Sequence, residues 1–299
     1  MILEINNKKY NGWEKSTLFR SVQTLSDRCL FETSNLGGLF LKTKAGDSAR
    51  VFLQDKLVFT GFVFQKYVDL KGKLILDVRD NSAKLVKLTL QPGGSEFFGI
   101  NTRDLLSEIT GLTVSGEAGE TMRHVRLNMD MPIVSILQNF ADRAGLIARA
   151  DTTGGINLSK VNRTSSNLIL KEGLSIFTAN HSDEWQPTAT DQKSFSSNDF
   201  SAATILSGTG ETVINIDGGS LTTGETQNMG VTRLGRLNLL NVVSISIDPY
   251  KFYETGNIVN IDISSLGLKE PRIINSIEIK RNGDEFSQIL NLVPTTSYA

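Results

Sequence analysis

Histidine and cysteine, which carry much of the metal-dependent and nucleophilic chemistry of proteins, are rare in this chain of 299 residues. The histidines are His124 and His181, and the single cysteine is Cys29. No His-x-x-x-His motif and no cysteine pair occurs, so the sequence predicts no transition-metal site. Cys29 lies in an apolar run typical of a strand, where we expect a small buried side chain rather than a nucleophile. One cysteine also excludes a disulfide framework within the chain.

Acidic pairs and glycine-rich turns are the remaining candidates for chemistry. Asp183-Glu184 has the residue types of a glycosidase carboxylate pair, but no neighbouring motif supports that role. Gly208-Thr209-Gly210 and Gly218-Gly219 lack the Lys-Ser/Thr or strand-helix context of a phosphate loop, which favours ordinary turns. The Gly-x-Ser-x-Gly motif is absent. A Ser-His-Asp site whose residues are far apart in the chain has no sequence signature, so the sequence alone does not exclude one. The sequence therefore predicts no enzyme, cofactor or metal ligand.

Composition is that of a globular protein, with 39% hydrophobic and 21% charged residues and a formal net charge of -1. No run of 18 apolar residues predicts a membrane span. Residues 1–6 lack the basic region and long apolar core of a secretory signal. Nor do basic residues and aromatics alternate in a cluster that would predict nucleic-acid binding.

Charge is distributed unevenly along the chain. Residues 1–100 carry 15 Lys and Arg against 10 Asp and Glu, whereas residues 171–299 carry 9 against 15. A basic end and an acidic end could give electrostatic complementarity between copies or with partners. Solvated faces without a role are an equally good interpretation of this pattern.

The stretch from Gly46 to Asp80 predicts three strands, because β-branched and aromatic residues fill it between turn residues. About 210 residues later, the segment from Gly256 to Val293 has the same order of turns and strands. Such a repeat predicts a duplicated β-meander, although any two meanders share some features. Residues 1–45 continue the β pattern, with a hairpin turn near Asn6 and with Trp13 as a core or interface anchor.

The middle of the chain changes its hydrophobic period. Asn101-Thr102 offers an N-cap for a helix over 103–110 that Gly111 ends. A second helix follows Pro132, with Asp130 as a possible cap and Gly145 at its end. Its apolar face repeats at helical spacing, and comprises Ile133, Ile136, Leu137, Phe140, Ala141 and Ala144. A hairpin over 146–161 completes a small α+β element.

From Leu170 onward the pattern is again β. Residues 194–230 are rich in Ser, Thr, Gly and Asn and predict long loops and hairpins, with one strand over 212–216. A further strand is expected over 239–247. We therefore predict a mainly β protein in which two similar β-barrel domains, 1–98 and 170–299, flank a small α+β domain over 99–169.

Several of these residues occur in an order that resembles the baseplate hub proteins of contractile phage tails, the Mu-like tail protein and its prophage and tailocin relatives. The first part of the resemblance is carried by Asn11-Gly12-Trp13, Arg20-Ser21, Gly46-Asp47, Thr60-Gly61 and Arg79-Asp80. The second part is carried by Leu137–Val161 and Leu170–Gly173. The chain departs from the family where Val78 replaces the glycine of Gly-Arg-Asp and where Met229–Asn238 matches the expected helix only loosely.

This resemblance implies a homotrimer in which two barrels per chain form a pseudo-six-fold ring. Such a ring would match a six-fold tail tube or its initiator on one side and a three-fold central spike on the other. Its other partners would be baseplate proteins. The protein would be a structural component of the virion tail, assembled in the cytoplasm of the bacterial host, without catalytic residues.

Two other classes remain open. One is another structural protein of a tail or secretion system. The other is a carbohydrate-binding β protein, which would need exposed aromatic residues on a concave face, yet the tryptophans are only Trp13 and Trp185.

Overall fold

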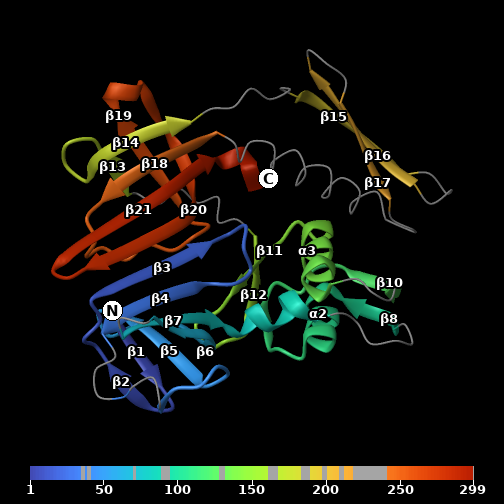
Figure 1. Ribbon diagram of the computed structural model, residues 1–299. Coiled ribbons are helices and arrows are strands. Elements are labelled where there is room, and N and C mark those ends of the chain that lie inside the picture. Colours follow the sequence, from blue (N-terminus) through green and yellow to red (C-terminus); the bar gives the residue numbers. More distant parts are fainter. Residues whose placement is uncertain are drawn as a thin grey trace.

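The computed structural model describes residues 1–34, 38, 42–69, 72–88, 95–127, 132–160, 168–182, 189–196, 201–208, 212–217 and 241–298. The protein is mainly β with a smaller α+β part, as the sequence predicts (Figure 1). Most strands belong to one sheet of 13, in the order β14-β18-β21-β20-β3-β4-β7-β6-β5-β1-β2, with β19 also beside β20 and β13 beside β19. In the described ranges no helix is long and apolar enough to cross a membrane.

The first β unit contains the strands predicted between residues 1 and 80. The turns at Asn6-Asn7 and Gln54-Asp55 have positive φ at both residues, as tight hairpins between twisted strands require. All neighbouring strands in this unit are antiparallel. They are β1 Ile2–Ile5, β2 Lys8–Tyr10, β3 Lys15–Ser21, β4 Arg28–Ser34, β5 Ser48–Leu53, β6 Lys56–Val68 and β7 Lys73–Asp80.

The second β unit contains the strands predicted near the C-terminus. The long strand β20 pairs with β19 from Leu268 to Ile273 and with β21 from Arg272 to Asn282. The strands of the unit are β13 Ile169–Lys171, β14 Ile176–Ser182, β18 Val242–Ile247, β19 Ile258–Ile263, β20 Leu268–Asn282 and β21 Glu285–Pro294. The short helices η4 Ser264–Leu266 and η5 Thr295–Tyr298 complete it.

The two β units repeat each other down to single hydrogen bonds. Gly46 N–H donates to the Val63 carbonyl at 2.8 Å, and Gly256 N–H donates to the Ile274 carbonyl at 2.7 Å. Directly after these positions, β6 and β20 each carry an irregularity in their pairing, with β7 and β21 respectively. Val63 then lies opposite Val78 as Ile274 lies opposite Leu292. This shared register supports the repeat that the sequence predicts.

The expected closure of each unit into a barrel is not found. None of the sheets of the described residues closes on itself, and the large sheet ends at β2 and β14. The physical reason is that β3 of the first unit pairs with β20 of the second over Lys15–Ser21 and Ser276–Asn282. One strand of each unit therefore pairs with a strand of the other unit, and neither unit closes its own sheet.

The α+β part combines the two predicted helices with two small sheets. Asn101 caps α2 Thr102–Thr110 by accepting from Asp104 N–H at 2.9 Å, and Gly111 ends it with φ +64°. Helix α3 Ile133–Arg143 begins after Pro132 and buries the predicted face except Ala144, which follows the helix and is half-buried. Asp130 lies outside the described residues. The sequence analysis missed the pair β8–β10. The other elements are η2 Asn81–Lys87, β8 Ser95–Asn101, β9 Val114–Gly116, β10 Thr121–Leu127, β11 Ile147–Ala150 and β12 Ile156–Ser159.

A separate three-stranded antiparallel sheet overlaps the segment 194–230 that was expected to form loops and hairpins. Its strands are β15 Ala189–Ser196, β16 Ser201–Gly208 and β17 Thr212–Asp217. The expected strand over 212–216 is therefore confirmed as β17. Asp183, Glu184, Trp185 and the loosely matching stretch 229–238 lie outside the described residues.

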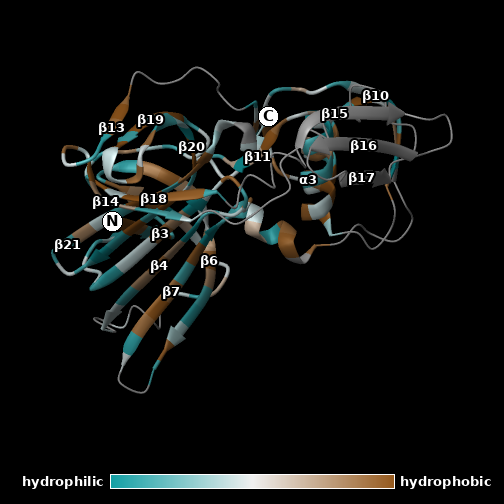
Figure 2. Ribbon diagram, turned by 90° about the horizontal axis from the view of Figure 1, so that it is seen from above, coloured by the Kyte–Doolittle hydropathy of each residue, from teal (hydrophilic) through white to brown (hydrophobic). Residues whose placement is uncertain are grey.

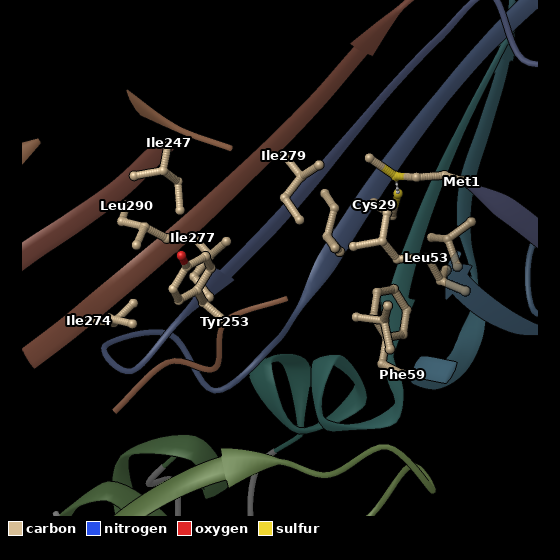
Figure 3. Close-up of a cluster of buried hydrophobic side chains, with 14 of the residues drawn as sticks. Met1, Cys29, Leu53, Phe59, Ile247, Tyr253, Ile274, Ile277, Ile279 and Leu290 are labelled. Carbon is tan, nitrogen blue, oxygen red and sulfur yellow. Dashed lines mark hydrogen bonds between the residues drawn. The ribbon is translucent and has the colours of Figure 1, made fainter. Parts of the chain in front are cut away.

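One hydrophobic cluster spans both β units. Figure 3 shows Cys29, Leu53 and Phe59 of the first unit in line with Ile279, Ile277 and Leu290 of the second. A second cluster fills the α+β part between its helices and the sheet of β11, β12 and β9. Figure 2 shows the same division, with the β units on one side and α3 on the other. The sheet that joins the units is therefore packed as one core.

Candidate assembly surfaces

The joint between the two β units is a pair of strand edges. Leu18 lies opposite Ile279 and both side chains are buried. Phe19 lies opposite Glu278 on the other face of the sheet. Backbone pairing satisfies two edges that would otherwise expose rows of unpaired N–H and C=O groups. The chain thus already contains one edge-to-edge contact between two similar units.

A buried charged junction connects the α+β part to both β units. The Asp27 carboxylate accepts a hydrogen bond from Arg20 Nε at 2.7 Å, and the Asp27 backbone N–H donates a hydrogen bond to Asp80 Oδ2. Arg149 of β11 donates to the Thr255 carbonyl in the second unit and to Ser159 Oγ at 2.9 Å. Because these groups come from all three parts of the chain, the junction fixes their relative orientation.

The electrostatics of this junction are dominated by burial. Burial, together with the negative charge of Asp27, raises the pKa of Asp80 to about 7. Burial also raises the pKa of Asp27, and it lowers the pKa of the Arg149 guanidinium. The positive charge of Arg20 and its hydrogen bond to Asp27 act in the opposite direction and lower the pKa of Asp27, which partly offsets the effect of burial. Proton binding at Asp80 is therefore linked to the packing of the junction.

Four of the residues that carry the family resemblance lie at or next to this junction. Gly61 lies opposite Asp80, and a Cβ on Gly61 would lie 1.9 Å from the Arg79 carbonyl oxygen. Thr60 Oγ1 donates to the Thr152 carbonyl of the α+β part at 2.8 Å. Arg20, Thr60, Gly61 and Asp80 are thus explained as residues that hold the three parts together rather than as residues that do chemistry.

Free strand edges and exposed apolar side chains mark the surfaces available for assembly. Strand β14 is one end of the large sheet, and most of its residues are exposed. Leu174, just before this strand, is 77% exposed, Phe177 near its start is 64% exposed, and Ile169 of β13 is 62% exposed. Exposed apolar side chains near the end of a sheet are typical of a contact with another chain.

The outer face of the first unit carries a group of cations around one carboxylate. Arg28 forms two hydrogen bonds with Asp77, at 2.9 and 3.1 Å, and Arg79 donates to Asp77 at 3.0 Å. The Arg79 guanidinium also lies over the Phe64 ring, 3.8 Å from its centroid. This group gives the face an ordered positive surface, in line with the basic balance of residues 1–100.

The cysteine and the two histidines do not lie together. Cys29 is fully buried with its Sγ 3.8 Å from Met1 Sδ, and burial raises the pKa of its thiol well above the usual range. His124 stacks on Phe98 of the β8–β10 pair, whereas His181 on β14 contacts Asn241 at 3.3 Å. The structure therefore places each on a different element.

Trp13 is a core anchor, as predicted. Its ring packs against Phe31 with centroids 4.8 Å apart, and its Nε1 donates to the Tyr10 carbonyl at 3.1 Å. Gly208 ends β16, while Gly210, Gly218 and Gly219 lie outside the described residues. Within the ranges that the structure covers, no three His, Cys, Asp or Glu residues gather in a way that could hold a metal ion.

Two features of the assembly surfaces were not predicted from the sequence. The edge strand β14 has a sequence signal, the run Ile176-Phe177-Thr178-Ala179, but a strand at a sheet edge has the same residue types as one inside a sheet. The contact of Arg149 with Thr255 has no signal at all, because it joins residues far apart in the chain.

No protein-family model matches the sequence, and no curated protein matches it. The fold is nevertheless similar to that of solved structures over almost the whole chain. The 43 kDa tail protein of prophage MuSo2 from Shewanella oneidensis has a TM-score of 0.81 and 17% identity, covering 99% of this chain and 98% of that one. A tail protein from Neisseria meningitidis MC58 has a TM-score of 0.81 and 14% identity, covering 99% and 97%.

A more distant likeness links the fold to secretion machinery. The E. coli c3393 protein is described as a component of the type VI secretion system with structural similarity to the T4 bacteriophage tail proteins gp27 and gp5. It has a TM-score of 0.64 and 9% identity, covering 98% of this chain and 76% of that one. The chain therefore has the fold of these phage tail and type VI secretion proteins.

Proposed function

We propose that this protein is a structural hub of a phage-tail baseplate that works by shape and interfaces rather than by catalysis. The observation that carries the proposal is the repeat of two β units in one chain, with the same register and an edge-to-edge joint between them. The fold shared with two prophage or bacterial tail proteins supports the same assignment.

The proposed assembly is a homotrimer whose six β units form a pseudo-six-fold ring. Three chains with two similar units each satisfy a six-fold and a three-fold neighbour at once, because the units are nearly equivalent and the chains are identical. Such a ring would join a six-fold tail tube, or its initiator protein, to a three-fold central spike. The remaining partners would be other baseplate proteins in the virion tail.

The units are proposed to be residues 1–98 and 170–299 in the ring, with residues 99–169 attached outside it. The charged junction around Asp27 and Asp80 supports a fixed attachment, because it ties β11 of the α+β part to both β units. The junction would then transmit force from the outer part to the ring without a hinge.

A structural protein of a type VI secretion system is the second candidate. It is favoured by the likeness to the E. coli protein that is described as a component of such a system. Carbohydrate binding has less support, because the exposed aromatics of the described residues, such as Tyr67, Phe98, Phe177 and Tyr250, lie on different elements.

Electron microscopy of the purified protein tests the proposed ring. We expect end-on class averages to show a ring with three-fold symmetry and six similar lobes. Addition of the spike protein from the same tail operon should add density on the axis at one face only. Compact particles without a central ring, both alone and with the spike protein, would contradict the hub assignment.

A further inference from the structure

Two phenylalanines and two arginines form a row across the outer face of the first unit. Phe19 lies opposite Arg28, and Arg28 lies opposite Arg79. Arg79 in turn lies opposite Phe62. These four residues, here called the outer row, come from β3, β4, β7 and β6, which lie side by side (Figure 1). Cys29, next to Arg28 in the chain, points to the other face and is buried in the core.

The outer row is positively charged although its two arginines share a carboxylate. Nε and one Nη of each arginine donate to Asp77, at 2.9 to 3.2 Å. Two cations around one anion leave one net positive charge. Among the described residues, the other Nη of each guanidinium has no hydrogen-bond acceptor, so both can donate to a ligand. Lys84 of η2 adds a third cation, with its Nζ 5.1 Å from the centroid of the Phe62 ring.

Aromatic rings in and beside the outer row are accessible to a partner. Phe19 is 36% exposed, and the side chain of Arg28 is 45% exposed. Phe62 is half-buried, and its ring centroid lies 6.2 Å from that of Phe64, which the Arg79 guanidinium covers. Aromatic and arginine side chains contribute most of the binding energy of many protein interfaces. The outer row therefore has the composition of a protein contact.

We infer that the outer row binds an acidic amphipathic helix of another protein. Residues opposite each other on antiparallel strands have Cα atoms about 4.5–5.5 Å apart, which sets the spacing of Arg28 and Arg79. Residues i and i+4 of a helix have Cβ atoms about 5–6 Å apart. Two carboxylates one helical turn apart therefore match the two guanidiniums, while an apolar stripe beside them packs on Phe19 and Phe62.

The arrangement favours a protein over a nucleic acid. A nucleic-acid strand carries a phosphate at every nucleotide and needs cations along its whole path, whereas the outer row and Lys84 provide three. Base stacking would also have to displace the cations that already lie over the Phe62 and Phe64 rings. The contact needs only the single chain, so the inference does not depend on the proposed trimer. In the proposed hub, the helix would belong to another baseplate protein.

A peptide-binding assay tests the inference. The probe is a fluorescein-labelled helical peptide of about 20 residues, made of Leu, Ala and Glu, with Glu pairs at i and i+4 beside a stripe of leucines. The control peptide has Gln at every Glu position. Fluorescence anisotropy measures binding to the full chain. We expect the Glu peptide to bind at least about tenfold more tightly than the Gln peptide and to lose affinity as salt is added.

Arg79→Gln and Lys269→Gln form a matched pair of variants, because each removes one positive charge. Arg79→Gln should weaken binding of the Glu peptide at least about fivefold, while Arg28 continues to compensate Asp77. Lys269 lies on β20 with its side chain 83% exposed, and its replacement should leave the affinity unchanged. Lys84→Gln, at an exposed position, gives the same test without altering the contacts of Asp77.

Each outcome bears on the inference. Equal binding of the Glu and Gln peptides, or equal effects of Arg79→Gln and Lys269→Gln, would overturn it. Tighter binding of a labelled oligothymidylate of similar length, weakened by Arg79→Gln, would assign the row to nucleic acid and overturn the inference. A lower mass of Arg79→Gln in solution without weaker peptide binding would overturn it in favour of a contact between copies. Selective binding of the Glu peptide by a monomer would support the inference while contradicting the proposed ring.

Discussion

Replacing Gly61 by alanine is expected to lower the free energy of unfolding by at least about 3 kcal/mol. A Cβ at this position would lie 1.9 Å from the Arg79 carbonyl oxygen and 2.6 Å from the Asp80 Cα. Both obstacles are backbone atoms of the adjacent strand, so a side-chain rotation cannot relieve the overlap. Urea unfolding followed by circular dichroism measures the effect.

Gly12→Ala is the matched control for this prediction. A Cβ on Gly12 would meet no atom within 4 Å, so the change should alter the free energy of unfolding by no more than about 0.5 kcal/mol. The Gly61 variant should also lose the contact between β6 and the α+β part. An alanine at 61 with nearly unchanged stability would show that β6 and β7 do not approach each other as closely as described.

The stability of the protein is expected to fall as the pH rises from 5 to 8. Burial raises the pKa of Asp80 from 3.8 to about 7, so the native state holds a proton between these values that the unfolded state releases. A group that binds its proton more tightly in the native state stabilises it at low pH, and this contribution is lost as the pH rises through about 7. Asp80 should therefore make the protein about 2 to 3 kcal/mol more stable at pH 5 than at pH 8.

Asp80→Asn separates this group from other titrations. The variant cannot ionise at position 80, so most of the pH dependence between 5 and 8 should disappear, and the remainder in the same direction belongs to Asp27. Asp284→Asn, in the exposed β20–β21 turn, should keep the full dependence. Chemical denaturation at several pH values provides the data. A wild type that gains stability toward pH 8 would contradict the buried, protonated state of Asp80.

The local structure of both β units could be predicted from the sequence. Alternating apolar residues between turn residues identified β5, β6 and β7 and their counterparts β19, β20 and β21. The capping residues Asn101 and Gly111 fixed the ends of α2. These features depend on residues that are close in the chain, so pattern and turn chemistry carry enough information.

The long-range arrangement could not be predicted in the same way. Two closed barrels were expected, whereas β3 and β20 pair with each other and join the units in one sheet. A strand whose edge pairs within its own unit and one whose edge pairs with another unit have the same residue types. The burial of Asp27 and Asp80 likewise depends on parts of the chain that meet only in the fold.

The central claim is that three copies associate into the proposed ring, and absolute mass in solution tests it most directly. Multi-angle light scattering over a range of concentrations should give a stable mass near 98 kDa, three times the chain mass of 32.8 kDa. A mass near 32.8 kDa at every concentration, unchanged by the spike protein, would contradict the account.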